Sequence, residues 1–345
     1  MANECISVER ITDEKYMARC IQLARCGALG APPNPMVGAV VVCRGAIIGE
    51  GYHRRCGGPH AEVNAIRSVR RPELLSQSTL YVSLEPCAHY GKTPPCADLI
   101  IEKKIPRVVI GCQDPFARVN GLGIRKLKEA GIDVTVGVLE QECVELNRCF
   151  MTFHSQHRPW VQLKWAQSKD GFISHADGTP VDLSTPFTRL LVHRIRAYSQ
   201  AILVGTRTVL TDNPSLLNRH LPGPSPLRLT IDRRGVLPQG LRMNEGETPC
   251  YIYKTGNLRE ILADLYERGV QRLLVEGGAS LLRSFMKEGL WDEIRVECCS
   301  RYLHEGVRAP EVPACLPATE QIFDGHTLRV IRNVHPESCR ECEKM

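Results

Sequence analysis

The feature that most constrains this chain is a set of metal-binding and acid–base residues spread over three short segments. His60 and Glu62 open a stretch with helical spacing, Cys87 follows an apolar run, and Cys96 comes soon afterwards. One imidazole and two thiols form a three-residue zinc ligand set, which leaves a fourth position for water. Zinc lowers the pKa of that water towards ~7, and a nearby carboxylate can move its protons. The fold must therefore bring two helix starts and one strand end together.

The spacing between the two thiols is unusual for such a site. Eight residues, 88–95, separate Cys87 from Cys96, where a tight turn with two intervening residues is common. Gly91 and Pro94 favour a constrained turn, and Pro95 favours a helix start. Cys96 then lies in the first helical turn, where the helix dipole favours a thiolate. Small buried hydrophobic cysteines are the alternative, but the joint pattern favours catalytic zinc.

Length and charge narrow the class of protein. A chain of 345 residues predicts two domains, and a net charge of +6 without blocks of like charge argues against a dedicated nucleic-acid binder. No apolar run is long enough to span a membrane, and the N-terminus does not resemble a signal peptide. The 16 cysteines therefore predict reduced thiols in the cytosol. Four of them fit core positions: Cys20, Cys43, Cys112 and Cys298. Cys339 and Cys342 form a lone C-x-x-C, which by itself predicts no metal site.

Periodicity predicts an α/β domain over residues 1–153. The expected helices cover residues 13–26, a segment from His60, a segment after Cys96, 122–130 and 140–153. The expected strands cover residues 37–43, 47–52, 79–84, 107–112 and 132–138, with the later strands mostly parallel.

A second α/β series is expected over residues 154–345, after a junction at 156–159. Its predicted strands are 161–166, 201–205, 227–232, 251–253, 272–276 and 293–298, and its predicted helices are 188–198 and 258–268. Residues 212–214 are expected to form a turn after a strand-like segment, and the proline-rich stretch 221–226 to form a loop.

Possible anion sites occur in this second half. Gly277 and Gly278 join a strand to a helix, which suits either a phosphate at the helix N-terminus or a plain turn. A Rossmann G-x-G-x-x-G fingerprint is absent. Arg196 and Arg219 are possible phosphate clamps or ordinary surface arginines. The basic turn at 232–234 has two equal interpretations: it binds the 2′-phosphate of a dinucleotide, or it is an ordinary solvent-exposed turn.

Several motifs together identify a family. Asn-Pro-Met-Val-Gly at 34–38, Pro-His-Ala-Glu-Val-Asn-Ala at 59–65 and the segment 84–96 resemble the bifunctional riboflavin-biosynthesis deaminase–reductases, and the eight-residue gap between thiols is typical of that family. In the second half, Ser-Lys-Asp-Gly at 168–171, the segment 208–214 and Val-Glu-Gly-Gly at 275–278 carry the resemblance. It implies a cytidine-deaminase-like three-layer α/β/α domain followed by a dihydrofolate-reductase-like α/β domain.

The resemblance also implies two consecutive reactions. The first is zinc-dependent hydrolytic deamination of a diaminopyrimidinone ribosylamine 5′-phosphate, and the second is reduction of its ribosyl group to a ribityl chain by NADPH. It assigns zinc to His60, Cys87 and Cys96, and proton transfer to Glu62. The implied contacts to the first substrate are Asn34, His53, His89 and Lys92, with Lys92 suited to the phosphate.

In the reductase half the resemblance implies substrate contacts at Arg196, Leu216, Arg219 and Glu276. The implied NADPH contacts are Ala166, Thr208, Asp212, Gly278, Ala279, Ser280, Leu281, Leu282, Arg283 and Ser284. Two positions depart from the family pattern: Pro180 and Asp182 stand where a serine and a tryptophan often contact the ligands. A proline nitrogen donates no hydrogen bond, and a carboxylate would repel a dinucleotide phosphate.

These departures motivate an alternative, a deaminase whose second domain reduces nothing. Two further hypotheses are a nucleic-acid-acting deaminase, disfavoured by the long thiol spacing, and a zinc scaffold, which would leave Glu62 unexplained. We expect a cytoplasmic homo-oligomer that binds a small phosphorylated substrate and neither nucleic acid nor membrane.

Overall fold

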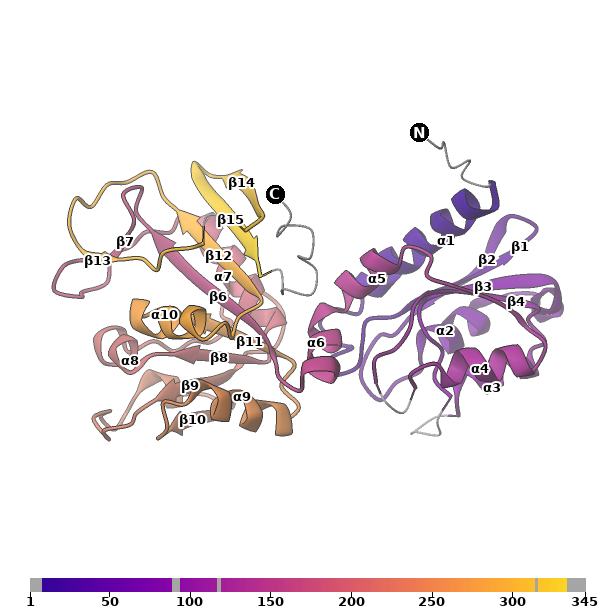
Figure 1. Cartoon of the computed structure of the whole chain (residues 1–345), viewed down its shortest axis with the longest axis horizontal. Coiled ribbons are helices and arrows are strands. Elements are labelled where there is room, and N and C mark those ends of the chain that lie inside the picture. The colour runs from indigo at the N-terminus through magenta and orange to yellow at the C-terminus, as the bar shows by residue number, and fades with distance from the viewer. Residues whose placement is uncertain (1–7, 89–93, 117–118, 314–315, 334–345) are drawn as a thin grey trace, which may run out of the picture. The chain divides into compact units, whose positions relative to one another are not determined.

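The computed structural model describes residues 8–88, 94–116, 119–313 and 316–333. The chain divides into two units, residues 1–156 and 157–345, each built around its own β-sheet (Figure 1). His89, Lys92, Cys339 and Cys342 lie outside the described residues. Within the described residues, no helix is both long enough and apolar enough to cross a membrane.

The first unit has a five-stranded sheet in the order β2-β1-β3-β4-β5. Strand β1 pairs antiparallel with β2 and β3, whereas β3, β4 and β5 are parallel. The strands are β1 (Gly38–Cys43), β2 (Ala46–Tyr52), β3 (Ser78–Leu84), β4 (Arg107–Cys112) and β5 (Asp133–Val136). Strands β1, β3 and β4 are almost entirely buried, which explains their continuous apolar runs.

Helices cover both faces of this sheet, so the expected three-layer α/β/α architecture is confirmed (Figure 1). The helices are α1 (Val8–Arg25), α2 (Ala61–Ser68), η1 (Pro72–Gln77), α3 (Cys96–Glu102), α4 (Leu122–Glu129), α5 (Glu140–Leu146) and α6 (Arg148–Gln156). Helices α1 and α5 pack on one face around Met17 and Cys143, and α2, α3 and α4 pack on the other around Ile100 and Leu127. Gly51 permits close packing of α2 on β2, because a Cβ there would lie 2.3 Å from the Ala65 nitrogen.

The second unit has an eight-stranded sheet in the order β10-β9-β8-β11-β6-β12-β15-β14. The six strands from β10 to β12 are parallel, and β15 and β14 continue the sheet antiparallel. These strands are β6 (Trp160–Gln167), β8 (Ala201–Val204), β9 (Leu227–Ile231), β10 (Cys250–Tyr253), β11 (Arg272–Glu276), β12 (Glu293–Cys298), β14 (Ala318–Phe323) and β15 (His326–Arg332). A separate two-stranded sheet joins β7 (Phe172–Ser174) to β13 (Val307–Arg308).

Alternating strand residues pack into two hydrophobic cores in this unit, one on each face of the sheet. Leu273 and Val275 of β11 face one core, and Leu274 between them faces the other. The first core is completed by helices α9 (Leu258–Glu267) and α10 (Ala279–Lys287), and the second receives side chains from α7 (Pro186–Tyr198), α8 (Thr206–Asp212) and η2 (Arg242–Asn244). Because the parallel strands share one direction, their carboxyl ends meet at one edge, where α/β folds bind ligands.

The structure corrects two expectations about elements. The single helix expected over 140–153 is two helices, α5 and α6, interrupted at Asn147. The buried Asn147 side chain accepts from the Met36 N–H and donates to the Met36 carbonyl oxygen, both at 2.8 Å, and this long-range pairing turns the chain. The strand-like segment before 212–214 is helix α8, in which Val209 is buried against the sheet. Asn213 then adopts a left-handed conformation, so the turn itself is confirmed.

The cysteines expected in the core are largely there. Cys20, Cys43 and Cys112 are buried, whereas Cys298 is only partly buried.

Candidate functional sites

The candidate metal residues converge at the carboxyl end of central strand β3. Cys87 follows β3, His60 immediately precedes α2, and Cys96 is the first residue of α3. The Ala97 N–H donates to the Cys87 carbonyl oxygen at 3.1 Å, which fixes the start of α3 beside the strand end. Three segments separated in sequence therefore meet at one point, as the spacing predicts.

The geometry of the three side chains fits a zinc ion. Their ligand atoms all lie within 4.8 Å of one another. His60 Nδ1 lies 3.5 Å from Cys87 Sγ and 3.3 Å from Cys96 Sγ. Ligands about 2.0–2.3 Å from a tetrahedral zinc ion are separated by roughly 3.5–3.8 Å, so small shifts would admit the metal. The Cys96 N–H also donates to Cys87 Sγ at 3.3 Å, which stabilises a thiolate.

Glu62 lies in the first turn of α2 and is only 3% exposed. Burial raises the pKa of its carboxyl group to about 7; His60 opposes this increase and Cys87 adds to it. A buried carboxylate next to the candidate ligands is placed to exchange protons with a molecule held there.

Asn34 and His53, two of the four predicted contacts to the first substrate, lie together. Nδ1 of His53 donates to the Pro59 carbonyl oxygen at 3.0 Å, so its Nε2 accepts from the Asn34 amide at 3.1 Å. Burial lowers the pKa of His53, which favours this neutral tautomer. The His53 ring also meets the His60 ring edge to face, with centroids 5.4 Å apart.

Sequence reasoning missed the role of Glu85, which is 4% exposed. Its carboxylate accepts four backbone N–H groups from the segment before α4 and from the first turn of that helix: those of Asp114, Gly121, Gly123 and Ile124, at 2.9–3.3 Å. This acid therefore anchors the loop after β4 to the strand end that presents Cys87. The available signal was an acidic residue at the end of a buried strand, two positions before a predicted ligand.

The second unit contains a cleft of about 1180 Å³ at the carboxyl ends of its parallel strands. All predicted reductase residues but one line it: Ala166, Arg196, Thr208, Asp212, Leu216, Arg219, Glu276, Gly278, Ala279, Ser280, Leu281, Arg283 and Ser284. The exception is Leu282, whose side chain is fully buried in the core between α10 and the sheet.

The glycine turn has the geometry of an anion cradle. Gly277 and Gly278 both have positive φ, and Gly278 immediately precedes α10. A Cβ on Gly278 would lie 3.2 Å from the Thr208 hydroxyl, so glycine keeps this space open. The N-terminus of α10 and the Thr208 hydroxyl therefore face the same part of the cleft.

Arg196 and Glu276, two predicted substrate contacts, form an ion pair with Nη2–Oε2 of 2.6 Å. Burial acts to raise the pKa of Glu276, but Arg196 and Lys164 outweigh it and the pKa is lowered. The carboxylate therefore stays ionised in the cleft.

His193, which the sequence did not single out, holds Arg219 in place. Its Nδ1 accepts the Arg219 backbone N–H at 3.2 Å, and its ring meets that of His220 edge to face. Burial, followed by the charges of Arg196, His220 and Arg219, lowers the pKa of His193 to about 4. No motif signals this role, because it depends on a contact between α7 and a distant loop.

The two departures from the family pattern, Pro180 and Asp182, also line the cleft. The Asp182 carboxylate pairs with the Arg189 guanidinium, and the Asp182 carbonyl oxygen accepts from Arg301 at 3.0 Å. Paired in this way, Asp182 is less repulsive to a phosphate than a free carboxylate would be.

Comparison with known families defines the class of protein. Residues 10–112 match the cytidine and deoxycytidylate deaminase zinc-binding region, and residues 159–303 match the RibD C-terminal domain. The chain thus joins a zinc-dependent deaminase domain to a dihydrofolate-reductase-like reductase domain, as the motifs predict.

Full-length relatives narrow this class to one family. The chain is 39% identical to the riboflavin biosynthesis protein RibD of Aquifex aeolicus over 86% of this chain and 90% of that protein, and 34% identical to RibD of Escherichia coli over 95% and 98%. A Thermotoga maritima crystal structure, described as a diaminohydroxyphosphoribosylaminopyrimidine deaminase/5-amino-6-(5-phosphoribosylamino)uracil reductase, matches with 37% identity and a TM-score of 0.85, covering 94% of this chain and all of that one. The chain belongs to the RibD family. Because these relatives align across both domains, the bifunctional interpretation is favoured over a deaminase with a non-reducing second domain.

Proposed function

We propose that this protein catalyses two consecutive steps of riboflavin biosynthesis. Residues 1–153 deaminate 2,5-diamino-6-ribosylamino-4(3H)-pyrimidinone 5′-phosphate, and residues 154–345 reduce the product to 5-amino-6-ribitylaminouracil 5′-phosphate. The proposal combines the family membership with the convergence of His60, Cys87 and Cys96 beside Glu62, which is the single observation that supports it most.

In the deaminase half, His60, Cys87 and Cys96 would hold zinc, which supplies a water of lowered pKa. Glu62 accepts a proton from the attacking water and delivers protons first to the ring nitrogen and then to the departing amine. The overall step consumes one water, replaces the amino group with a carbonyl oxygen and releases ammonia.

The first substrate would be bound by side chains around this centre. The neutral His53 and the Asn34 amide lie next to each other and would both contact the pyrimidine. Because both ring nitrogens of His53 are already hydrogen-bonded, the remaining polar groups of this pair belong to the Asn34 amide. His89 and Lys92 complete the proposed set, and the ammonium group of Lys92 suits the 5′-phosphate.

In the reductase half, the cofactor is proposed to be NADPH, which supplies a hydride. The glycine turn, the start of α10, Thr208, Asp212 and Ala166 would bind it along the cleft. Arg196, Leu216, Arg219 and Glu276 would hold the phosphorylated uracil, with the Arg196–Glu276 ion pair fixing both side chains.

A two-stage assay on purified, zinc-replete protein tests the proposal. The diaminopyrimidinone ribosylamine phosphate is supplied and ammonia is followed; NADPH is then added and its oxidation is followed. We expect ammonia release and then NADPH oxidation. Ammonia without NADPH oxidation would limit the reductase resemblance to the fold, and no ammonia would refute the proposed substrate.

A cytoplasmic location and a homo-oligomeric state remain predictions. They would be tested by fractionating cell extracts and by measuring the mass of the purified protein in solution.

A further inference from the structure

Three side chains of the second unit form a hydrogen-bonded series that ends in the reductase cleft. Glu297 of β12 is 2% exposed, and both of its carboxylate oxygens are hydrogen-bonded. Oε2 accepts from the Ser184 hydroxyl at 2.7 Å, and Oε1 lies 2.8 Å from Nδ1 of His326, the first residue of β15 and also buried. Ser184 is the member of the series that lines the cleft. None of the three belongs to the residues implied by the family resemblance.

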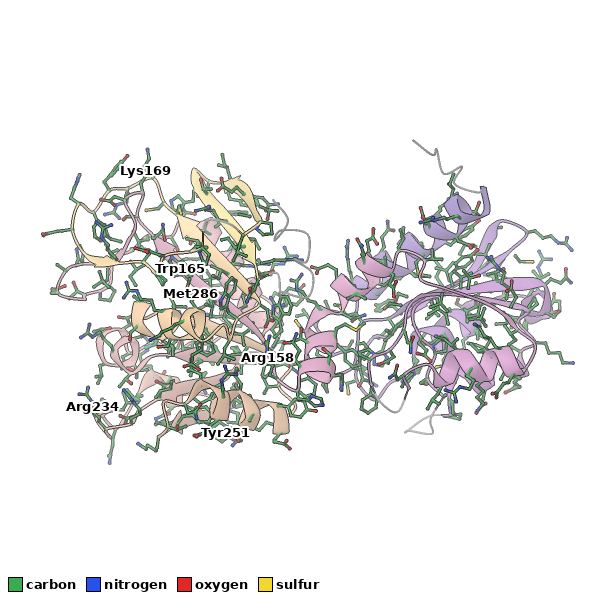
Figure 2. The ribbon with its side chains drawn as sticks, in the orientation of Figure 1. Arg158, Trp165, Lys169, Arg234, Tyr251 and Met286 are labelled. Carbon is green, nitrogen blue, oxygen red and sulfur yellow. The ribbon has the colours of Figure 1, made fainter. Side chains whose placement is uncertain are left out.

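Strand alternation places Glu297 on the same face of the sheet as a cleft residue of the neighbouring strand. Trp165 of β6 and Val296 of β12 pack into the core beside α10, and Figure 2 labels Trp165 there. Successive strand residues point to opposite faces, so Ala166 and Glu297 point away from that core. The two are partners in the parallel β6–β12 register, and Ala166 lines the cleft. The Glu297 carboxylate therefore meets Ser184 at the wall of the cleft.

The hydrogen bonds of Ser184 make its oxygen an acceptor towards the cleft. A serine hydroxyl has one proton and two lone pairs, and Ser184 donates its proton to Glu297. A carboxylate accepts hydrogen bonds and returns none, and its second oxygen accepts from the His326 Nδ1–H, which holds the group in this orientation. Hydrogen bonds to a carboxylate are stronger than those between neutral groups, and they polarise the donor. The lone pairs of Ser184 therefore suit an N–H or O–H group of a ligand.

The backbone holds Ser184 in place as well. It directly precedes Thr185, the N-cap of α7, which forms a capping box with Thr188. Two residues before Ser184, the Asp182 carbonyl oxygen accepts from Arg301 at 3.0 Å. A ligand donor would thus meet an oxygen whose backbone and proton are both fixed, which lowers the entropy lost on binding.

The position of this acceptor relative to the proposed uracil site indicates which ligand group it meets. Glu276 ends β11, two strands from β12, so Glu276 and Glu297 are separated by roughly 10 Å across the sheet. Under the proposed function, Glu276 and Arg196 hold the phosphorylated uracil, whose sugar chain would span this gap. The sugar carries hydroxyl donors, whereas the oxygens of the 5′-phosphate are acceptors, which a second acceptor cannot bind.

We propose that Ser184, oriented by Glu297, accepts a hydrogen bond from a hydroxyl of the sugar chain on which the reductase acts. The inference rests on the reductase half of the proposed function and goes beyond it by naming a further substrate contact and the residue that positions it. Ser184 contacts the sugar, Glu297 acts only through Ser184, and His326 holds Glu297. The contact favours a hydroxylated chain at the β6–β12 end of the cleft.

Binding of the proposed product to the full-length protein tests this contact without turnover. 5-Amino-6-ribitylaminouracil 5′-phosphate and NADP⁺ are titrated calorimetrically into the wild type and into each variant. In Ser184→Ala we expect product affinity to fall about 5- to 10-fold, as for the loss of one hydrogen bond, with NADP⁺ affinity unchanged. Ser184→Thr keeps the hydroxyl and should restore most of the affinity. The control Ser174→Ala removes another cleft serine, whose hydroxyl donates to the His175 carbonyl oxygen at 3.2 Å, and should bind both ligands normally.

Glu297→Gln tests the positioning role. A glutamine amide can donate to the serine oxygen and no longer fixes the serine proton, so we expect about 2- to 5-fold weaker product binding. The double variant S184A/E297Q should bind the product no more weakly than Ser184→Ala alone, because Glu297 acts through the serine. Additive losses in the double variant would show that Glu297 has only a structural role.

Three results would overturn the inference: a wild type that does not bind the product, a Ser184→Ala variant with the product affinity of the wild type, or a loss confined to NADP⁺, which would assign the serine to the cofactor. Turnover separates this inference from the proposed function. If product binding depends on Ser184 but NADPH is not oxidised, the proposed reduction fails and the contact stands. If NADPH is oxidised and Ser184→Ala binds the product normally, the contact fails alone.

Discussion

At the scale of single residues, two buried carboxylates beside the candidate zinc ligands have different surroundings. Glu85 accepts four backbone N–H groups and is therefore committed to holding a loop. Glu62 lies two residues after His60, in the first turn of α2, and its pKa is raised by burial. The sequence alone does not distinguish the two acids. The structure does, because the hydrogen bonds of Glu85 indicate a structural role and the surroundings of Glu62 indicate a chemical one.

Replacing Glu62 should remove proton transfer without removing the metal. In Glu62→Gln we expect ammonia release to fall by roughly 10²- to 10⁴-fold, because an amide cannot accept the water's proton. Zinc content, measured on the same protein, should be unchanged. Glu73→Gln, the same change at an exposed site, should be silent. Near-normal turnover in Glu62→Gln would show that another group carries the proton.

His193 should make the stability of the second unit depend on pH. Burial and neighbouring cations lower its pKa to about 4, so the unfolded chain, with a value of about 6.5, takes up a proton first as the pH falls. Its contribution to the free energy of unfolding is thus full above about pH 6.5 and is lost towards pH 4.

This pH dependence can be tested by urea unfolding, monitored through tryptophan fluorescence. The fluorescence reports on the second unit, because Trp160, Trp165 and Trp291 all belong to it. Between pH ~7.5 and pH ~5, the wild type should lose more stability than His193→Asn, which keeps an acceptor but cannot charge. Equal losses in the two proteins would contradict the assigned pKa shift.

At the scale of elements, the deaminase site is assembled from the ends of β3, α2 and α3. The sequence located these ends well, since glycine, proline and apolar runs mark them locally. It located α8 and the break between α5 and α6 badly. Val209 is helical because the helix buries it against the sheet, and Asn147 interrupts a helical pattern because its amide bonds to Met36. Both depend on distant partners.

The loop leading into α4 should loosen when Glu85 is changed. Glu85→Gln replaces one accepting oxygen with an NH₂ group, which leaves buried N–H groups unpaired at a cost of about 1–3 kcal/mol. We expect faster amide hydrogen exchange at Gly121, Gly123 and Ile124. We also expect a roughly tenfold lower zinc affinity, measured in competition with a chelator.

The control for this variant is Glu129→Gln, an exposed acid at the end of α4. It should leave both exchange and zinc retention unchanged. If exchange in Glu85→Gln matches the wild type, the four hydrogen bonds do not hold the loop.

At the scale of the whole molecule, each unit has its own sheet, core and candidate site. Chelation of zinc should therefore abolish ammonia release while NADPH oxidation with the already deaminated uracil continues. The tryptophan unfolding transition should not move, and added zinc should restore ammonia release. A parallel loss of both activities on chelation would indicate that the second unit also needs the metal.

The sequence by itself determined the family and both domain types, and it predicted the candidate ligand set. These depend on side-chain chemistry and on spacing along the chain: an imidazole and two thiols can be recognised as zinc ligands wherever the fold places them. Element ends were predictable for the same reason, since turn-forming residues act on their immediate neighbours.

Only the tertiary structure decided which polar groups pair with other protein groups in hydrogen bonds or ion pairs. Asp232 looked like part of a basic turn, but its carboxylate is turned inward to backbone N–H groups, and Asp182 looked repulsive but pairs with Arg189. His193 carried no signal at all until α7 brought it to Arg219. Hydrogen bonds and ion pairs depend on distances in space. For residues far apart in the sequence, only the folding of the chain sets those distances.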